Sequence, residues 1–140
     1  MITVENKCGR LLEVSIGQDI SQQDVGEMVQ AVRLHALATK GTFVLVATLD
    51  RTSAFAPEAN EPLLQMLVRD NPKIARSGYL LRARYGSLAL QVDRLVRSAG
   101  NPNRRWFYDA GELAAWLREA LDVTERQRLS VFLGQVAPRA

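Results

Sequence analysis

The stretch Phe43-Val-Leu-Val-Ala-Thr-Leu49 decides the fold class of this 140-residue chain. All seven residues are apolar or β-branched, which is the length and composition of a strand. A strand without alternation between apolar and polar residues is typical of a sheet that is covered on both faces. The run therefore predicts the central strand of an α/β domain, with helices on either side of it.

Residues on both sides of this run alternate between strand and helix patterns. Runs 2–5 and 11–16 are separated by the turn-forming Asn6-Lys7-Cys8-Gly9 and predict a hairpin. Further strands are expected at 79–84 and 105–108. Helices are expected over 22–39, from Pro62, from Leu88, after Asp109 and over 124–135.

Helix starts are marked by side chains that cap free backbone N–H groups. Three pairs have the three-residue spacing of a capping box: Ser21 with Asp24, Asp109 with Glu112, and Thr124 with Gln127. The resulting order is β-β-α-β-α-β-α-β-α-α. It predicts a mixed, mostly parallel sheet in one domain, residues 1–121. Residues 122–140 are expected to form a C-terminal helix packed on the domain or on a partner.

Composition and rare residues restrict the chemistry. With 47% apolar and 24% charged residues the chain is typical of a soluble globular protein, and no apolar run approaches the ~20 residues of a membrane helix, so a cytoplasmic location is expected. Cys8 is the only cysteine and His35 the only histidine, which excludes an internal disulfide and a Cys/His zinc site. No glycine-rich phosphate motif is present. No cofactor, metal or catalytic residue is predicted, and an enzyme with an unrecognised site stays an alternative.

Charge is distributed unevenly along the chain. The net charge is +3, yet residues 69–105 hold nine basic and two acidic side chains, a local charge of +7, so the remainder sums to −4. Arginines in the basic segment are candidates for binding a partner or an anion: Arg82, Arg84, Arg94, Arg97 and Arg105. Because the elements that carry them are consecutive, we expect a contiguous cationic surface; an ordinary solvated face is the alternative.

Residues 105–117, Arg-Trp-Phe-Tyr-Asp-Ala-Gly-Glu-Leu-Ala-Ala-Trp-Leu, carry a family resemblance. A strand that ends in Phe-x-Asp, followed by a helix with Ala and Trp-Leu, resembles the STAS superfamily and within it the SpoIIAA-like (STAS/CRAL-TRIO-type) bacterial proteins. The preceding helix, with Gln91, Arg94 and Arg97, is similar too. The resemblance implies a STAS-like α/β fold. We therefore expect a non-catalytic regulatory or scaffolding domain, of the kind used in signalling, that acts by protein–protein interaction. Its CRAL-TRIO side implies a lipid pocket.

The same resemblance suggests a phosphorylation site. Regulatory STAS proteins are phosphorylated on a Ser in an Asp-Ser-x-Gly-like segment after the central strand. The corresponding Asp50-Arg51-Thr52-Ser53-Ala54 has the hydroxyls of Thr52 and Ser53 but lacks the Gly. Both hydroxyls are therefore candidate sites, and local hydrogen bonds to the loop backbone are the alternative.

The expected partner is a protein with an acidic surface, because the candidate residues are cationic. Anionic lipid headgroups at a membrane surface are the alternative. Nucleic acid is not expected, since only 6% of residues are aromatic and no groove-entry motif is present. The last helix offers a second apolar surface, which packs within the chain or forms a homodimer: Leu129, Phe132, Leu133 and Val136.

Overall fold

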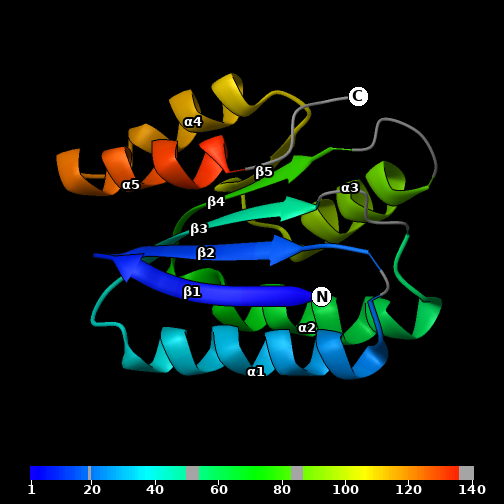
Figure 1. Ribbon diagram of the computed structural model, residues 1–140. Coiled ribbons are helices and arrows are strands. Elements are labelled where there is room, and N and C mark those ends of the chain that lie inside the picture. The colour runs from blue at the N-terminus through cyan, green and yellow to red at the C-terminus, as the bar shows by residue number, and fades with distance from the viewer. Residues whose placement is uncertain (19, 50–53, 83–86, 136–140) are drawn as a thin grey trace.

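A five-stranded sheet forms the centre of the computed structural model, which describes residues 1–18, 20–49, 54–82 and 87–135 (Figure 1). The strands follow one another across the sheet in sequence order: β1 (Ile2–Cys8), β2 (Leu11–Ile16), β3 (Phe43–Leu49), β4 (Ile74–Leu81) and β5 (Arg104–Phe107). β1 pairs with β2 in the antiparallel sense, and each later pair is parallel. The predicted mixed sheet with an initial hairpin is confirmed.

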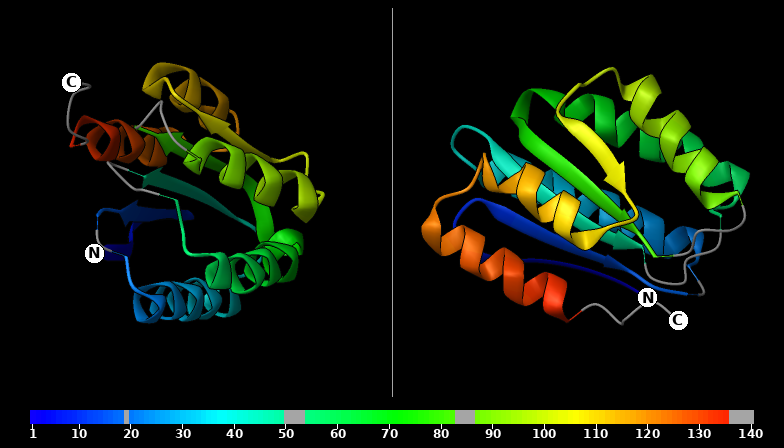
Figure 2. Two further views of the ribbon diagram at one scale, coloured as in Figure 1. Left: turned by 90° about the vertical axis from the view of Figure 1, so that its right-hand side faces the viewer. Right: turned by 90° about the horizontal axis from the view of Figure 1, so that it is seen from above.

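Helices cover both faces of the sheet (Figures 1 and 2). One face carries α1 (Gln22–Ala38), α2 (Asn60–Asp70) and α3 (Leu88–Ala99), and the other carries α4 (Ala110–Arg118) and α5 (Val123–Gly134). Short 3-10 turns, η1 (Pro57–Ala59) and η2 (Asn71–Lys73), precede and follow α2. The predicted element order is confirmed. None of the helices in the described ranges has the length and apolar character that crossing a membrane requires.

β3 lies between two hydrophobic cores, as its sequence predicts. All seven of its residues are buried. Phe43 and Leu45 point into the core beneath α1, α2 and α3, whereas Val44 and Val46 point into the core beneath α4 and α5. Because successive side chains of a strand point to opposite faces, an unbroken apolar run satisfies both cores at once.

The hairpin turn is tighter than the sequence predicts. β1 continues to Cys8, so the predicted turn at residues 6–9 is wrong, and the chain reverses at Gly9 and Arg10. Asn6 Nδ2 donates to the backbone oxygens of Gly9 and Leu11, both at 2.9 Å, so this residue supports the turn from within the strand. Gly9 has φ 53°, and a Cβ there would lie 2.3 Å from Glu125 Oε2. Only glycine fits this position.

β4 starts at Ile74, five residues before the predicted start at 79. The polar Arg76 and Ser77 and the following Gly78 conceal its first half in the sequence. Ser77 is fully buried and its hydroxyl bonds to the hydroxyl of Tyr79 at 2.7 Å. A Cβ on Gly78 would lie 3.0 Å from Leu113 Cδ1, so this glycine lets α4 approach the sheet closely.

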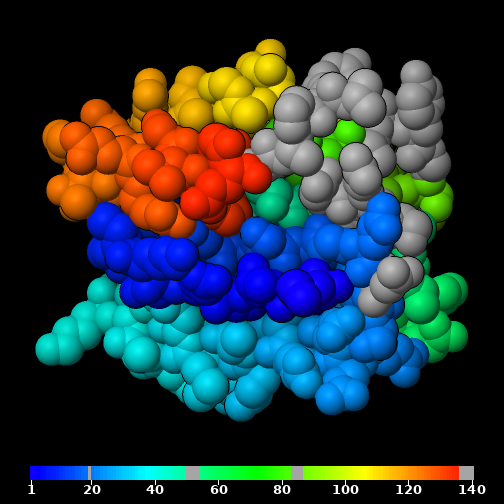
Figure 3. Space-filling model, in the orientation of Figure 1, coloured from blue at the N-terminus to red at the C-terminus, as the bar shows by residue number. Residues whose placement is uncertain are grey.

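α5 packs against the sheet of its own chain. In Figure 3 it lies directly against the β1-β2 hairpin, and Leu129 and Phe132 are buried in the core that it shares with α4. Arg128 donates two hydrogen bonds to the buried Glu13 of β2, at 2.6 and 2.7 Å. A homodimer through this helix stays a prediction, and Val136 lies outside the described residues.

The capping box of α5 differs from the predicted one. The capping box expected at Ser21 is confirmed, and Asp109 caps α4 by accepting a hydrogen bond from the backbone N–H of Glu112. The box predicted at Thr124 is wrong, because Asp122 caps the helix and exchanges hydrogen bonds with Glu125. Glu125 also accepts a bond from the backbone N–H of Arg10 at 2.6 Å. This contact with the hairpin turn selects a helix start two residues earlier than the Thr124 pattern.

Candidate functional site

A groove of about 390 Å³ runs between α2 and α3. Its lining includes half-buried Phe55, Leu64 and Leu95 and exposed Glu61, Leu90 and Arg94. α2 follows β3 and α3 follows β4, so the first turns of both helices lie near the carboxyl ends of parallel strands. Ligands of α/β sheets bind at this end.

Gln91 of α3 fixes one wall of the groove. Its Oε1 accepts from the backbone N–H of Phe55 at 2.7 Å, and its Nε2 donates to the backbone oxygen of the same residue at 3.1 Å. Nε2 also donates to Asn60 Oδ1 at 2.8 Å, at the start of α2. One amide side chain therefore holds the segment before α2 against α3.

Arg94 is the cation on the groove. It is exposed, and within the described residues its guanidinium makes no hydrogen bond or ion pair. Arg97, one turn later, is different because it pairs with Asp93 at 2.9 Å, and Asp93 also accepts a hydrogen bond from Trp106 Nε1 at 3.1 Å. Of these two predicted arginines, Arg94 is the one placed to meet a ligand in the groove.

Arg105 lies on the other side of the sheet, so the expectation of one contiguous cationic surface is wrong for this residue. Its guanidinium stacks over Phe107 and Trp116, 5.1 and 5.4 Å from the ring centroids, on the face covered by α4. Strand alternation is the reason, because consecutive residues of β5 must face opposite sides. Arg82 is half-buried after the end of β4. Arg84, Thr52 and Ser53 lie outside the described residues.

Arg104 is buried, with 3% of its surface exposed, although the sequence counts it in the basic segment. Its three nitrogens donate to Asn71 Oδ1, the Tyr79 hydroxyl and the backbone oxygen of Leu67, at 2.9, 2.7 and 3.0 Å. The sequence contains one signal for this role. Arg104 stands two residues before Trp106, and alternation therefore places both side chains on the same, inward face.

Other arginines stabilise the end of α4. The last carbonyl groups of a helix lack intrahelical partners and carry partial negative charge. Arg76 donates to the Trp116 oxygen, Arg126 to the Arg118 oxygen and Arg10 to the Ala120 oxygen, at 2.5, 3.0 and 2.7 Å. These side chains come from β4, α5 and the turn between β1 and β2, so part of the arginine content holds the end of α4 in place.

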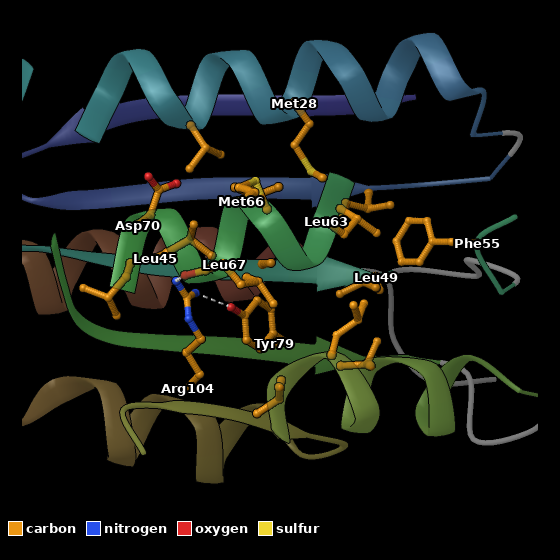
Figure 4. A pocket seen from close by; sticks show the side chains of 18 residues that line it. Met28, Leu45, Leu49, Phe55, Leu63, Met66, Leu67, Asp70, Tyr79 and Arg104 are labelled. Carbon is orange, nitrogen blue, oxygen red and sulfur yellow. Dashed lines mark hydrogen bonds between the residues drawn. The ribbon is translucent and has the colours of Figure 1, made fainter. Parts of the chain in front are cut away.

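An apolar cavity of about 70 Å³ lies beneath the groove, between the sheet and α1, α2 and α3 (Figure 4). Aliphatic side chains line most of it, and Tyr79 and Arg104 lie at one edge, joined by the hydrogen bond drawn in the figure. Phe55 lies at the opposite end. The cavity is far smaller than the 300–1,000 Å³ of ordinary small-molecule pockets.

The single histidine and the single cysteine of the chain have structural surroundings. His35 packs edge-on against Phe43 with ring centroids 4.8 Å apart, and burial lowers its pKa below the usual value. Cys8 is half-buried at the end of β1. Across the described ranges, no group of three or more His, Cys, Asp and Glu side chains is arranged to hold a metal ion.

The sequential mixed sheet with helices on both faces defines the class of this molecule as a SpoIIAA-like α/β fold. Among solved structures, the chain is similar to the crystal structure of an uncharacterized DUF3478-family protein with a SpoIIAA-like fold from Shewanella loihica PV-4. The TM-score is 0.59 and the sequence identity 16%, and the match covers 84% of this chain and 92% of that one. Neither a protein-family model nor a curated protein matches the sequence.

This similarity confirms the predicted STAS/SpoIIAA-like fold. At 16% identity it concerns the fold alone, and its counterpart is itself uncharacterized. A fold hosts many functions, so function has to be argued from the site.

Proposed function

We propose that this chain is a non-catalytic regulatory domain that binds an acidic segment of another protein in the groove between α2 and α3. The observation that carries the proposal is Arg94, an exposed guanidinium beside the groove without a partner in the described residues. A carboxylate of the partner would accept two parallel hydrogen bonds from the Arg94 guanidinium. Within the described residues, no side chain makes such a pair with Arg94.

The surroundings of Arg94 suit a protein ligand. Leu90, one helical turn before it, is 62% exposed and adds apolar surface at the rim of the groove. Phe55 and Leu64 add apolar surface deeper in the groove. An apolar centre with a charged residue at its rim is the usual anatomy of an interface, and arginine is enriched among the residues that carry binding energy.

The groove engages one segment and not a whole domain face. Its volume of about 390 Å³ has room for only a few side chains. A segment of a few side chains buries little surface, and interfaces that bury little surface are typically weak and transient. Transient binding fits a regulatory role, because the partner has to be released.

Site-specific cross-linking in the native host tests this proposal. A photoreactive phenylalanine analogue placed at Leu90 is expected to capture an acidic partner, and Arg94→Glu is expected to abolish that cross-link. Arg118→Glu is the matched control, because Arg118 is exposed on α4, on the other face of the sheet. Charge reversal of one acidic residue in the partner is expected to restore the cross-link to the Arg94→Glu variant.

Two outcomes contradict the proposal. The first is a cross-link of equal yield in the Arg94→Glu and Arg118→Glu variants. The second is flotation of the chain with anionic vesicles that Arg94→Glu abolishes and high salt weakens, since this result favours the membrane-surface alternative.

A further inference from the structure

β1 forms one edge of the sheet, and its outer side lies at the surface. Within the described sheet, the order β1-β2-β3-β4-β5 gives this strand β2 as its one neighbour. In Figure 3 the atoms of β1 form a dark blue band between α5 above and α1 below. An edge strand presents a row of backbone N–H and C=O groups that can pair with a strand of another chain.

Ile2 and Val4 direct their backbone groups away from β2. In an antiparallel pair, residues that bond to the partner strand alternate with residues whose N–H and C=O point the other way. Met1 accepts a hydrogen bond from the N–H of Gly17 at 2.9 Å, and the alternation makes Thr3 the next bonded residue. In the part of the chain that the structure describes, no other segment bonds to the outward groups of Ile2 and Val4.

The two edges of the sheet differ in their protection against pairing. Natural edge strands are protected when they are short, charged or bulged. β5, at the opposite edge, has four residues and carries the exposed Arg105. β1 has seven residues, and Ile2–Glu5 precedes the irregularity in its register. The charge of Glu5 is already paired with Lys7 at 3.1 Å. We call Ile2–Glu5 the open edge.

Apolar side chains lie along the open edge and beside it. Ile2 and Val4 pack against the core beneath α1, but both are only half-buried. On α5, Val131 is 51% exposed and lies about 140° around the helix from Arg126, at ~100° per residue. Arg126 bonds to the end of α4, so Val131 lies on the flank away from α4, where Figure 2 shows the open edge.

The sequence of the open edge is complementary to itself in one antiparallel register. Pairing through the outward groups of Ile2 and Val4 restricts the possible registers. With Val4 on a two-fold axis, Thr3 lies opposite Glu5 of the second copy, and Ile2 lies opposite its Asn6. This register opposes no like charges and places the two Val4 side chains against each other. An axis one residue later would oppose Glu5 with Glu5, which is unfavourable.

We propose that two copies of this chain pair through the open edge, antiparallel about an axis at Val4, and form one continuous sheet of ten strands. α1 separates the open edge from α2 (Figures 1 and 2), so the groove between α2 and α3 stays accessible in each copy. A dimer thus presents two grooves, which would strengthen binding to a partner with two acidic segments. The pairing itself does not depend on a partner in the groove.

Engineered disulfides test the register. Hydrogen-bonded residues across an antiparallel pair have Cα atoms about 5.5 Å apart, within the range of a disulfide. In a Cys8→Ser background, Val4→Cys is therefore expected to form a covalent dimer on mild oxidation. Thr3→Cys is the matched control on the same strand. The two copies of residue 3 are diagonal neighbours about 7–8 Å apart, beyond disulfide reach, so no covalent dimer is expected.

Sedimentation equilibrium of the full chain measures the dimer in solution. The wild type is expected to reach about twice the monomer mass of 15.6 kDa. Thr3 is exposed, so its substitution spares the core. Thr3→Lys creates two Lys–Glu pairs and is expected to lower the Kd of the dimer, whereas Thr3→Glu is expected to raise it, each by roughly two- to thirtyfold. The double variant Thr3→Glu/Glu5→Lys is expected to restore dimerisation.

Gln65→Lys and Gln65→Glu are the matched controls, because they place the same charges on an exposed position of α2. Both are expected to leave the Kd unchanged. The proposal is overturned if the wild type sediments as a monomer up to several hundred micromolar. It is also overturned by equal cross-linking of Val4→Cys and Thr3→Cys, or by a dimer whose Kd does not respond to either charge at residue 3.

Discussion

Arg104 and Arg105 are adjacent in the sequence and have opposite environments. Arg104 is buried and donates to three neutral acceptors beneath α2, whereas Arg105 is exposed and stacks on the rings of Phe107 and Trp116. A buried guanidinium is tolerated only when its N–H groups are satisfied. At the scale of the residue, the alternation of a strand gives two side chains of the same type different roles.

This contrast predicts unequal effects of one substitution. Arg104→Met leaves buried acceptors without donors, so it is expected to lower the free energy of unfolding by about 1.5–3 kcal/mol. Arg105→Met removes only exposed cation–π contacts and is expected to cost less than about 1 kcal/mol. Urea unfolding of both variants beside the wild type measures the difference. Equal losses would show that Arg104 does not depend on its hydrogen bonds.

α5 is held to the hairpin by contacts between charged or polar groups as well as by apolar packing. Glu13 is 4% exposed, and both its oxygens accept hydrogen bonds from Arg128. Glu125 joins the helix cap to the backbone of Arg10. At the scale of the element, the sequence of α5 alternates only weakly between apolar and polar faces. The buried carboxylates of Glu13 and Glu125 therefore help to position this helix against the hairpin.

Arg128→Ala is expected to loosen α5, because it leaves the buried Glu13 carboxylate without its partner. Hydrogen exchange of the backbone amides is the measurement: exchange in α5 should become faster while α1 and α2 keep their protection. Replacing both Glu13 and Arg128 by leucine removes the buried carboxylate together with its partner. This double variant is expected to restore much of the protection of α5. Unchanged exchange in the Arg128→Ala variant would contradict this account of how α5 is held.

The whole molecule has two cores that share one sheet. The core beneath α4 and α5 includes Leu129 and Phe132 of the last helix together with Leu11 and Val44 of the sheet. Burying a large apolar side chain contributes about 1.5–3 kcal/mol, so these two α5 residues contribute about 3–6 kcal/mol together. Small domains have only about 5–15 kcal/mol of net stability.

A chain that ends at residue 121 is therefore expected to lose its cooperative unfolding transition. A chain that ends at residue 135 keeps α5 and is the matched control. Thermal unfolding followed by near-ultraviolet circular dichroism makes the comparison. If both chains unfold with the same midpoint, α5 is an accessory to the fold and not a part of its core.

The sequence by itself determined the order and type of the elements. The run Phe43–Leu49 predicts a strand buried on both faces because apolar side chains without alternation have only one stable environment. Capping residues such as Ser21 and Asp109 are local signals, since a side chain bonds to a backbone N–H only three residues away. Fold class and the helix that carries Gln91 and Arg94 were predictable for the same reason.

Only the tertiary structure decided which of these residues share a site. The sequence did not reveal the start of β4 at Ile74, because the polar Arg76 and Ser77 do not resemble a buried strand. Ser77 bonds to Tyr79, two residues away, and Arg76 bonds to Trp116, 40 residues away. The separation of Arg94 from Arg105, the hold of Gln91 on Phe55 and the cavity that the Phe55 ring lines all depend on contacts between distant segments. Local patterns record what a side chain prefers, whereas its partner is fixed by how helices and strands pack.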